Sequence, residues 1–407
     1  MFTKSKYTWV LVVIFIAMIN ILYASDEKNN IIRLESETSV LIQNENLDIT
    51  DQRNLLYETN IVDTSNSDIF VHQKTSYEDI KNSKLIEFDN NGNVIDDNIL
   101  SRFPDKNELY KINKIVKTAD DGFLIVQNSD ADLPVNFTVK KVDKSLNELW
   151  TKKFDNKGTL ILITALTALN DGYVVSGYGY DDIENGKSKF VAYKLDNNGK
   201  LLYNIEHTYD ANFMPFRVIS NKNDIIVCGK TYEGNTENIW ITYINTYGDI
   251  SWKRNFTNCT ILGQSELLNN NFAIVVNSNK DLPKNKFRMM QFDLLGNKIW
   301  EKIYTPPYKY EQFKTLCSED KYILLCKYST LSDHNDEITT KYRATAIDNA
   351  GHLLWEEDVG ILKNKKIEDM KRVKNNTFLI IGTGNDIMSK NDILWVGKFI
   401  TRKYILR

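Results

Sequence analysis

The chain has 407 residues, of which 51 are Lys or Arg and 54 are Asp or Glu, so its net charge is −3; hydrophobic residues make up 42% and charged residues 26%. This composition is typical of a globular protein and excludes a wholly disordered chain, a collagen-like chain and a membrane protein with many spans. A near-neutral charge also argues against a dedicated nucleic-acid-binding protein, which needs a basic surplus to neutralise phosphates.

The first 25 residues have the pattern of an export signal. Two lysines precede the apolar run from Tyr7 to Tyr23, which is at the short limit for a helix that spans a bilayer. Ala24 and Ser25 then lead into an acidic start. We predict that residues 1–25 are a signal peptide and that the rest is extracytoplasmic, either secreted or in the periplasm or cell envelope. An uncleaved segment is the alternative, and it is the only membrane contact that we expect.

One sequence motif recurs seven times from residue 50 onward. An alternating apolar segment ends in Asp or a similar residue, a short turn with Gly follows, and an aromatic residue often comes seven positions after the Asp. The Asp slot is filled by Asp89, Asp143, Asp196, Asn245, Asp293, Asp348 and Thr401. The mean step is about 52 residues, which is the spacing of propeller blades rather than of helical repeats.

A second motif precedes each copy of the first. It consists of a turn and a short apolar segment, such as NDGYVVSG. Each unit therefore predicts four strands; in the unit around Asp196 they are residues 161–169, 173–177, 189–195 and 200–207. Asn-Gly and Asp-Gly turns between alternating segments favour hairpins, because both residues tolerate positive φ. We predict an all-β protein, a single β-propeller of seven four-stranded blades over residues 50–407.

The two ends of the chain complement each other. The last unit lacks an outer strand, because only six residues remain after Thr401. Residues 26–49 form a linker in which the segment 31–42 alternates between polar and apolar residues. We expect this segment to supply the missing strand, which would join both termini in one blade and remove an exposed edge.

The Asp-turn-Gly-Trp motif resembles the quinoprotein-type, or PQQ-like, β-propeller repeats of secreted bacterial proteins. The resemblance covers roughly residues 50 to 407 and concerns the type of repeat, not any one enzyme. In such repeats the aromatic residue is structural and packs between adjacent blades. The resemblance implies that role here for Trp150, Tyr203, Trp252, Trp300 and Trp355.

The sequence offers no catalytic, cofactor-binding or metal-binding residues that we can name. The four histidines, at 72, 207, 334 and 352, are scattered over separate units, whereas a zinc site needs three or four converging ligands. HExxH, Walker, GxGxxG and GxSxG motifs are absent. A PQQ-dependent dehydrogenase needs a cofactor cage in its central channel, and no segment provides one. We therefore expect no cofactor and no catalysis.

Charge placement is the one functional signal. In a propeller, the connections between the second and third strands of all blades lie on one face. Here they carry 14 Asp and Glu against 5 Lys, a net charge of −9. The densest clusters are Asp181, Asp182 and Glu184, and Asp333, Asp336 and Glu337. These clusters can attract Ca²⁺ or a basic partner. Alternatively, Asp and Asn occur there because they form turns well.

Apolar and aromatic residues occur in the connections from one blade to the next, on the same face. They are Phe213 to Phe216 and Pro306 to Tyr310. Aromatic side chains beside acidic loops suit protein or glycan binding, although they can equally pack the top of the ring.

The sequence favours a monomeric scaffold that binds a protein or glycan at its acidic loop face. A secreted propeller enzyme, a glycan hydrolase or lyase, is one alternative. A membrane-tethered sensor ectodomain is another, and it requires that the N-terminal segment is not cleaved.

Overall fold

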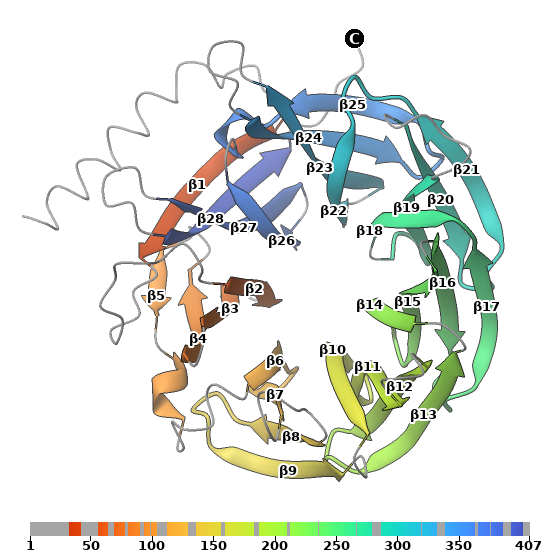
Figure 1. Ribbon diagram of the computed structural model, residues 1–407. Coiled ribbons are helices and arrows are strands. Elements are labelled where there is room, and N and C mark those ends of the chain that lie inside the picture. The colour runs from red at the N-terminus through yellow and green to blue at the C-terminus, as the bar shows by residue number, and fades with distance from the viewer. Residues whose placement is uncertain are drawn as a thin grey trace, which may run out of the picture.

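The alternating segments of the repeat form strands that pair in groups of four, and the seven groups form a ring in the computed structural model (Figure 1). This confirms the predicted seven-bladed β-propeller. The structure describes residues 32–41, 56–63, 69–77, 80–89, 93–97, 99–103, 112–128, 136–155, 159–182, 187–209, 212–234, 236–265, 267–278, 286–318, 320–331, 338–362, 365–374, 376–385 and 392–401. The predicted signal peptide lies outside the described residues.

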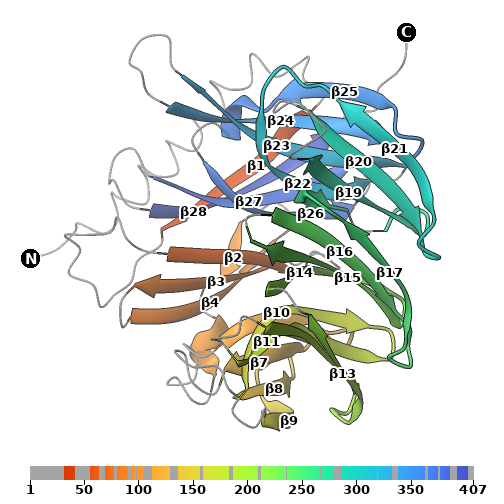
Figure 2. The same cartoon turned by 45° about the vertical axis from the view of Figure 1, so that its right-hand side comes forward.

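Each blade runs from an inner strand at the centre of the ring to an outer strand at its rim (Figures 1 and 2). Blades 1 and 2 consist of β2 (Leu56–Asp63), β3 (Ile69–Tyr77), β4 (Ile80–Phe88) and β5 (Val94–Asp96), and of β6 (Ile112–Lys117), β7 (Phe123–Asn128), β8 (Asn136–Val142) and β9 (Glu148–Asp155). Blades 3 and 4 consist of β10 (Leu160–Leu169), β11 (Gly172–Asp182), β12 (Lys187–Asp196) and β13 (Leu201–Tyr209), and of β14 (Asn212–Asn221), β15 (Asp224–Glu233), β16 (Thr236–Ile244) and β17 (Ile250–Phe256).

Blades 5 and 6 consist of β18 (Cys259–Gln264), β19 (Asn271–Ser278), β20 (Phe287–Asp293) and β21 (Lys298–Tyr304), and of β22 (Tyr310–Ser318), β23 (Lys321–Leu331), β24 (Ile338–Asp348) and β25 (Leu353–Asp358). Blade 7 consists of β26 (Lys366–Lys374), β27 (Thr377–Asn385), β28 (Asp392–Thr401) and β1 (Ile32–Leu41). Two short 3₁₀ helices are η3 (Ile99–Arg102) and η5 (Gly360–Leu362).

The core lies between neighbouring blades rather than within any one of them. One hydrophobic cluster combines Val126 and Val139 of blade 2 with Ile161, Val175 and Val191 of blade 3. The second and third strands are buried on both faces because they are covered by a blade on each side, which explains their continuous apolar sequence. A single sheet of this kind cannot bury its own apolar faces, so the blades depend on one another.

The N-terminal strand completes the last blade. β1 pairs antiparallel with β28, from Ile32 opposite Thr401 to Leu41 opposite Ile393. Figure 1 shows β1, in red, along the outer side of β28, in blue. Both ends of the described chain therefore lie in blade 7, and the outer edge of β28 is covered by backbone hydrogen bonding.

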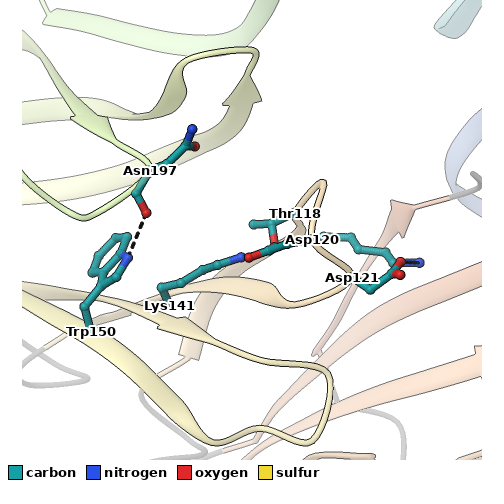
Figure 3. Close-up of polar contacts among 7 residues, drawn as sticks. Thr118, Asp120, Asp121, Lys141, Trp150 and Asn197 are labelled. Carbon is teal, nitrogen blue, oxygen red and sulfur yellow. Dashed lines mark hydrogen bonds and ion pairs between the residues drawn. The ribbon is translucent and has the colours of Figure 1, made fainter.

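An aromatic residue on the outer strand of each of blades 2 to 5 joins that blade to the next. The indole Nε1 of Trp150 donates a hydrogen bond to the carbonyl oxygen of Asn197, 3.0 Å away in the β12–β13 turn (Figure 3). Gly199 in that turn has φ +80°, and a Cβ built there would lie 2.7 Å from the ring of Trp150. Only glycine allows the ring to approach so closely. We call this pairing of ring and glycine the aromatic lock.

The aromatic lock recurs at four consecutive junctions, from blade 2 to blade 6. The pairs are Trp150 with Gly199, Tyr203 with Gly248, Trp252 with Gly296, and Trp300 with Gly351. Trp252 and Trp300 also donate to carbonyl oxygens of the next blade, those of Leu294 at 2.8 Å and Asn349 at 2.9 Å. Trp355 of blade 6 is buried in a cluster with Met370 of blade 7.

Candidate functional site

The face that carries the connections between second and third strands is the one to which the sequence assigned binding. Asp181 and Asp182 lie at the end of β11, where that face begins. Glu184, Asp333, Asp336 and Glu337 lie in connections outside the described residues, so the binding role predicted for the two acidic clusters stays a prediction. In the part of the chain that the structure describes, no three His, Cys, Asp or Glu residues are placed to hold a metal ion.

The described part of this face presents an ordered aromatic pair at blade 6. Tyr308 lies in the connection from β21 to β22 and is 37% exposed. Its ring stacks on that of Tyr328 in β23, with 4.4 Å between the ring centres and 8° between the planes. Tyr328 is buried, so the exposed ring of Tyr308 stacks on a ring that the surrounding core holds in place.

Charged side chains surround this pair. Arg343 in β24 makes a two-fold hydrogen bond to Asp358 in β25, with Nε 2.8 Å from Oδ1 and Nη2 3.1 Å from Oδ2. Glu356 lies 3.4 Å from its Nη1. The guanidinium is 5.6 Å from the ring centre of Tyr308, within the range of a cation–π contact.

The ionisation of these groups is fixed by the same contacts. Burial would raise the pKa of Asp358, but hydrogen bonds from Arg343 and Tyr328 outweigh it and lower that pKa. The hydrogen bond to Asp358 raises the pKa of Arg343. Burial and the hydrogen bond to Asp358 raise the pKa of Tyr328. At neutral pH the cluster therefore combines a neutral phenol, a carboxylate and a guanidinium.

This arrangement suits recognition. We call Tyr308, Tyr328, Arg343, Glu356 and Asp358 the blade 6 cluster. Tyr and Arg are among the residues enriched at the energetic centres of binding interfaces, because they combine a large apolar surface with hydrogen-bonding groups. Two carboxylates and the exposed ring lie within one small area, and the sheet holds them rigidly. A partner would lose little of its binding energy in ordering them.

The histidines are not brought together. His72 is buried in β3, His207 lies in β13, and His352 in the β24–β25 turn is 2.9 Å from Asp348. His334 lies outside the described residues. These positions belong to three different blades and do not converge.

The four cysteines, at positions 228, 259, 317 and 326, are buried thiols that form no disulfide bond. Cys317 lies opposite Tyr322 and Cys326 opposite Phe313, so the hairpin of β22 and β23 does not set the two cysteines against each other. Burial raises the pKa of the Cys326 thiol well above its ordinary value, which makes it a poor nucleophile.

Helices contribute little to the described residues, and none of those present has the length and apolar character needed to cross a bilayer. The apolar run from Tyr7 to Tyr23 is not among these residues.

Comparisons with known proteins support the fold and do not assign a family. No protein family model matches the sequence, and no curated protein matches it significantly. One of two prolyl endopeptidases analysed together matches 80% of this chain with a TM-score of 0.51 and 10% identity. This chain spans 45% of that protein's length.

Other matches are more distant. An unknown-function protein from Dyadobacter fermentans covers 91% of this chain, 99% of its own length, with a TM-score of 0.46 and 8% identity. A chain from the complex of Drosophila Plexin A with Semaphorin 1b covers 90% of this chain and 87% of its own length, with a TM-score of 0.47 and 6% identity. At such low identity, similarity concerns the fold alone.

Proposed function

We propose that the protein is a non-catalytic scaffold whose loop face binds a protein or glycan. The blade 6 cluster carries this proposal, because it exposes an aromatic ring beside fixed charges on a rigid sheet. The acidic connections predicted on the same face extend the surface, and they favour a partner with basic or hydroxyl groups. The resemblance of the repeat to PQQ-like propellers is consistent with a scaffold, and it stays a prediction.

The proposal includes an extracytoplasmic location and a monomeric state. The basis for the location is the signal-like segment of residues 1–25. Mass spectrometry of the protein recovered outside the cytoplasm tests the location, and a mature N-terminus at Ser25 or Asp26 is expected. Recovery only in the membrane fraction with an intact N-terminus would favour the tethered ectodomain instead.

The binding test uses two defined sets of probes. The purified protein is screened on a glycan array and on a peptide array that contains basic, neutral and acidic sequences. The strongest binder is then titrated against the protein and against a Tyr308→Ala variant. Loss of a central aromatic contact costs about 2 kcal/mol or more, so we expect binding to weaken at least about tenfold.

Tyr247→Ala is the matched control. Tyr247 is 80% exposed at the tip of the β16–β17 turn, on the opposite face of the ring, and its replacement should leave binding unchanged. No binder on either array, or equal loss in both variants, would contradict the proposal. Chemical conversion of a bound glycan would show an enzyme instead.

A further inference from the structure

The junction between blades 1 and 2 lacks the aromatic lock. The position that holds Trp or Tyr in blades 2 to 5 is Asp96 in blade 1, and the position of the turn glycine is Leu146 in blade 2. Leu146 keeps the left-handed backbone of that glycine, with φ +67°, and its side chain is buried. A leucine held in this conformation costs about 1–2 kcal/mol, so its side chain must be well packed to compensate.

A 3₁₀ helix packs against Leu146 at this junction. η3 follows the short strand β5, and its Ile99 and Leu100 are buried in one cluster with Leu146 and Phe123. Arg102 at its end forms an ion pair with Asp96. The aromatic lock is thus replaced by an apolar contact and an exposed ion pair.

A cavity of about 320 Å³ lies between these two blades. It is lined by Phe70, Glu87, Ile99, Arg102, Lys117, Asp121, Phe123 and Lys144. The cavity lies on the face of the hairpin turns, opposite the loop face that carries the blade 6 cluster. It is therefore separate from the surface to which we assign partner binding.

The charges in this cavity differ from those at the equivalent places in blades 2 and 3. Two residues before the Asp of the turn, those blades carry buried lysines. Lys141 binds Thr118 and Asp120 in its own blade (Figure 3), and Lys194 is 2.9 Å from Asp171. In blade 1 the same position holds Glu87, so the sign of the charge is reversed.

The lining presents both signs of charge to a ligand. Lys117, whose side chain is 8% exposed, lies 3.4 Å from Asp121 and 4.9 Å from the ring centre of Phe70. Figure 3 shows Asp121 at the end of the β6–β7 hairpin, beside Asp120. Arg102 and Lys144 are exposed, and Glu87 is partly buried. Three cations and two carboxylates thus surround the same small space.

We propose that this cavity binds a small zwitterion, a molecule of the size of a free amino acid or dipeptide that carries one ammonium and one carboxylate. The ligand carboxylate is received by Arg102 and Lys144, and its ammonium by Glu87 and Asp121. A ligand that carries a single charge is attracted by the wall residues of opposite charge but repelled by those of like charge. A zwitterion can place each of its charges against wall residues of opposite charge. A volume of about 300 Å³ is at the lower end of small-molecule sites.

The test is calorimetric titration of the purified protein at low ionic strength with glycine, phenylalanine and glycylglycine. Sodium acetate and methylammonium chloride, at matched ionic strength, supply each charge alone. We expect saturable binding of at least one zwitterion, and no saturation by acetate or methylammonium. Equal binding of acetate would overturn the assignment in favour of an anion site, and the absence of any saturation would show that the cavity takes no such ligand.

Lys144→Gln identifies the place of binding without disturbing the core, because Lys144 is exposed in the β8–β9 turn. Loss of one charge-assisted hydrogen bond should weaken binding about tenfold. Lys200→Gln is the control, since Lys200 is exposed at the corresponding hairpin of blade 3. Equal effects of both substitutions, or none of Lys144→Gln, would place the ligand elsewhere.

Discussion

The junctions from blade 2 to blade 6 and the junction of blade 1 with blade 2 solve the same packing problem in different ways. At the former, an aromatic ring lies against a glycine in the next turn, 2.7 Å from a Cβ built at Gly199. At the latter, Leu146, a 3₁₀ helix and an Asp96–Arg102 ion pair take that place, and a cavity remains. The junction of blades 1 and 2 therefore departs from the four junctions that share the aromatic lock, and it depends on apolar packing and an ion pair instead.

Removal of β1 should lower the stability of the protein most, because it takes a whole strand from blade 7. The deletion tests whether the junctions between blades hold the ring together without β1. Deletion of residues 26–48 exposes the edge of β28, which β1 covers over residues 393–401. At about 1 kcal/mol net for each backbone hydrogen bond, we expect a loss on the order of 5 kcal/mol and a sharply lower melting temperature. Thermal unfolding by circular dichroism measures it; an unchanged melting curve would show that blade 7 does not need β1.

Loss of an aromatic lock should lower the free energy of unfolding more than loss of the Asp96–Arg102 ion pair that stands in its place in blade 1. Trp252→Ala removes a ring that packs against Phe272 and donates to Leu294. We expect a loss of about 3 kcal/mol in the free energy of unfolding, as for large aromatic residues cut back to alanine.

Asp96→Ala is the comparison at the same position of blade 1. It breaks an ion pair with Arg102, whose side chain is 55% exposed, and such pairs contribute about 0–1 kcal/mol. Urea unfolding compares the two variants. Equal losses would mean that the aromatic lock contributes no more than the ion pair does.

The glycine side of the aromatic lock can be tested with two turns of similar backbone. Gly199→Ala places a methyl group against the ring of Trp150, whereas Gly234, with φ +61°, has no atom within 4 Å of the added carbon. Left-handed strain of about 1 kcal/mol applies to both, and overpacking adds about 1–3 kcal/mol at Gly199 only. Differential scanning calorimetry should show a clearly lower melting temperature for Gly199→Ala than for Gly234→Ala.

A smaller, pH-dependent effect is expected where the outer strands of blades 3 and 4 meet. Nε2 of His207 lies 2.6 Å from Nζ of Lys253. Burial and the charge of Lys253 lower the pKa of His207 below 6.5. The unfolded chain therefore binds a proton more readily than the folded protein. Stability from this contact is present above about pH 6.5 and is lost as the pH falls through the lowered pKa.

His207→Gln removes the titrating group and is the appropriate variant. Its melting temperature should fall less between pH 7 and pH 5 than that of the unchanged protein. Identical pH dependence in both would show that other groups control acid stability.

The sequence predicted the strands of blade 3 closely. Residues 161–169 were expected as the inner strand and β10 covers Leu160–Leu169; residues 200–207 were expected as the outer strand and β13 covers Leu201–Tyr209. Alternation and turn residues are local properties, so they can be read without the fold. The second strand was underestimated, since β11 extends to Asp182 beyond its apolar part. Its polar end is ordered by pairing with β12, which local composition does not reveal.

The candidate sites were predicted less well. Tyr308 was identified from its connection, but its contact with Arg343, which binds Asp358, was not. Arg343 lies directly opposite Asp358 in the pairing of β24 and β25, so the register of that hairpin was the one signal that could have found the pair. The cavity was also missed, although Asp96 and Leu146 already departed from the repeat in the sequence.

The sequence by itself determined the architecture. Two motifs recur with the same period of about 52 residues and so repeat one local four-stranded unit seven times. Such units are stable only when they stack on one another. Tertiary structure alone decided the three features on which our proposals rest. Ring closure pairs residues about 360 positions apart, the blade 6 cluster combines three strands and a connection, and the cavity arises between two blades. Each depends on contacts between distant segments, which no local pattern specifies.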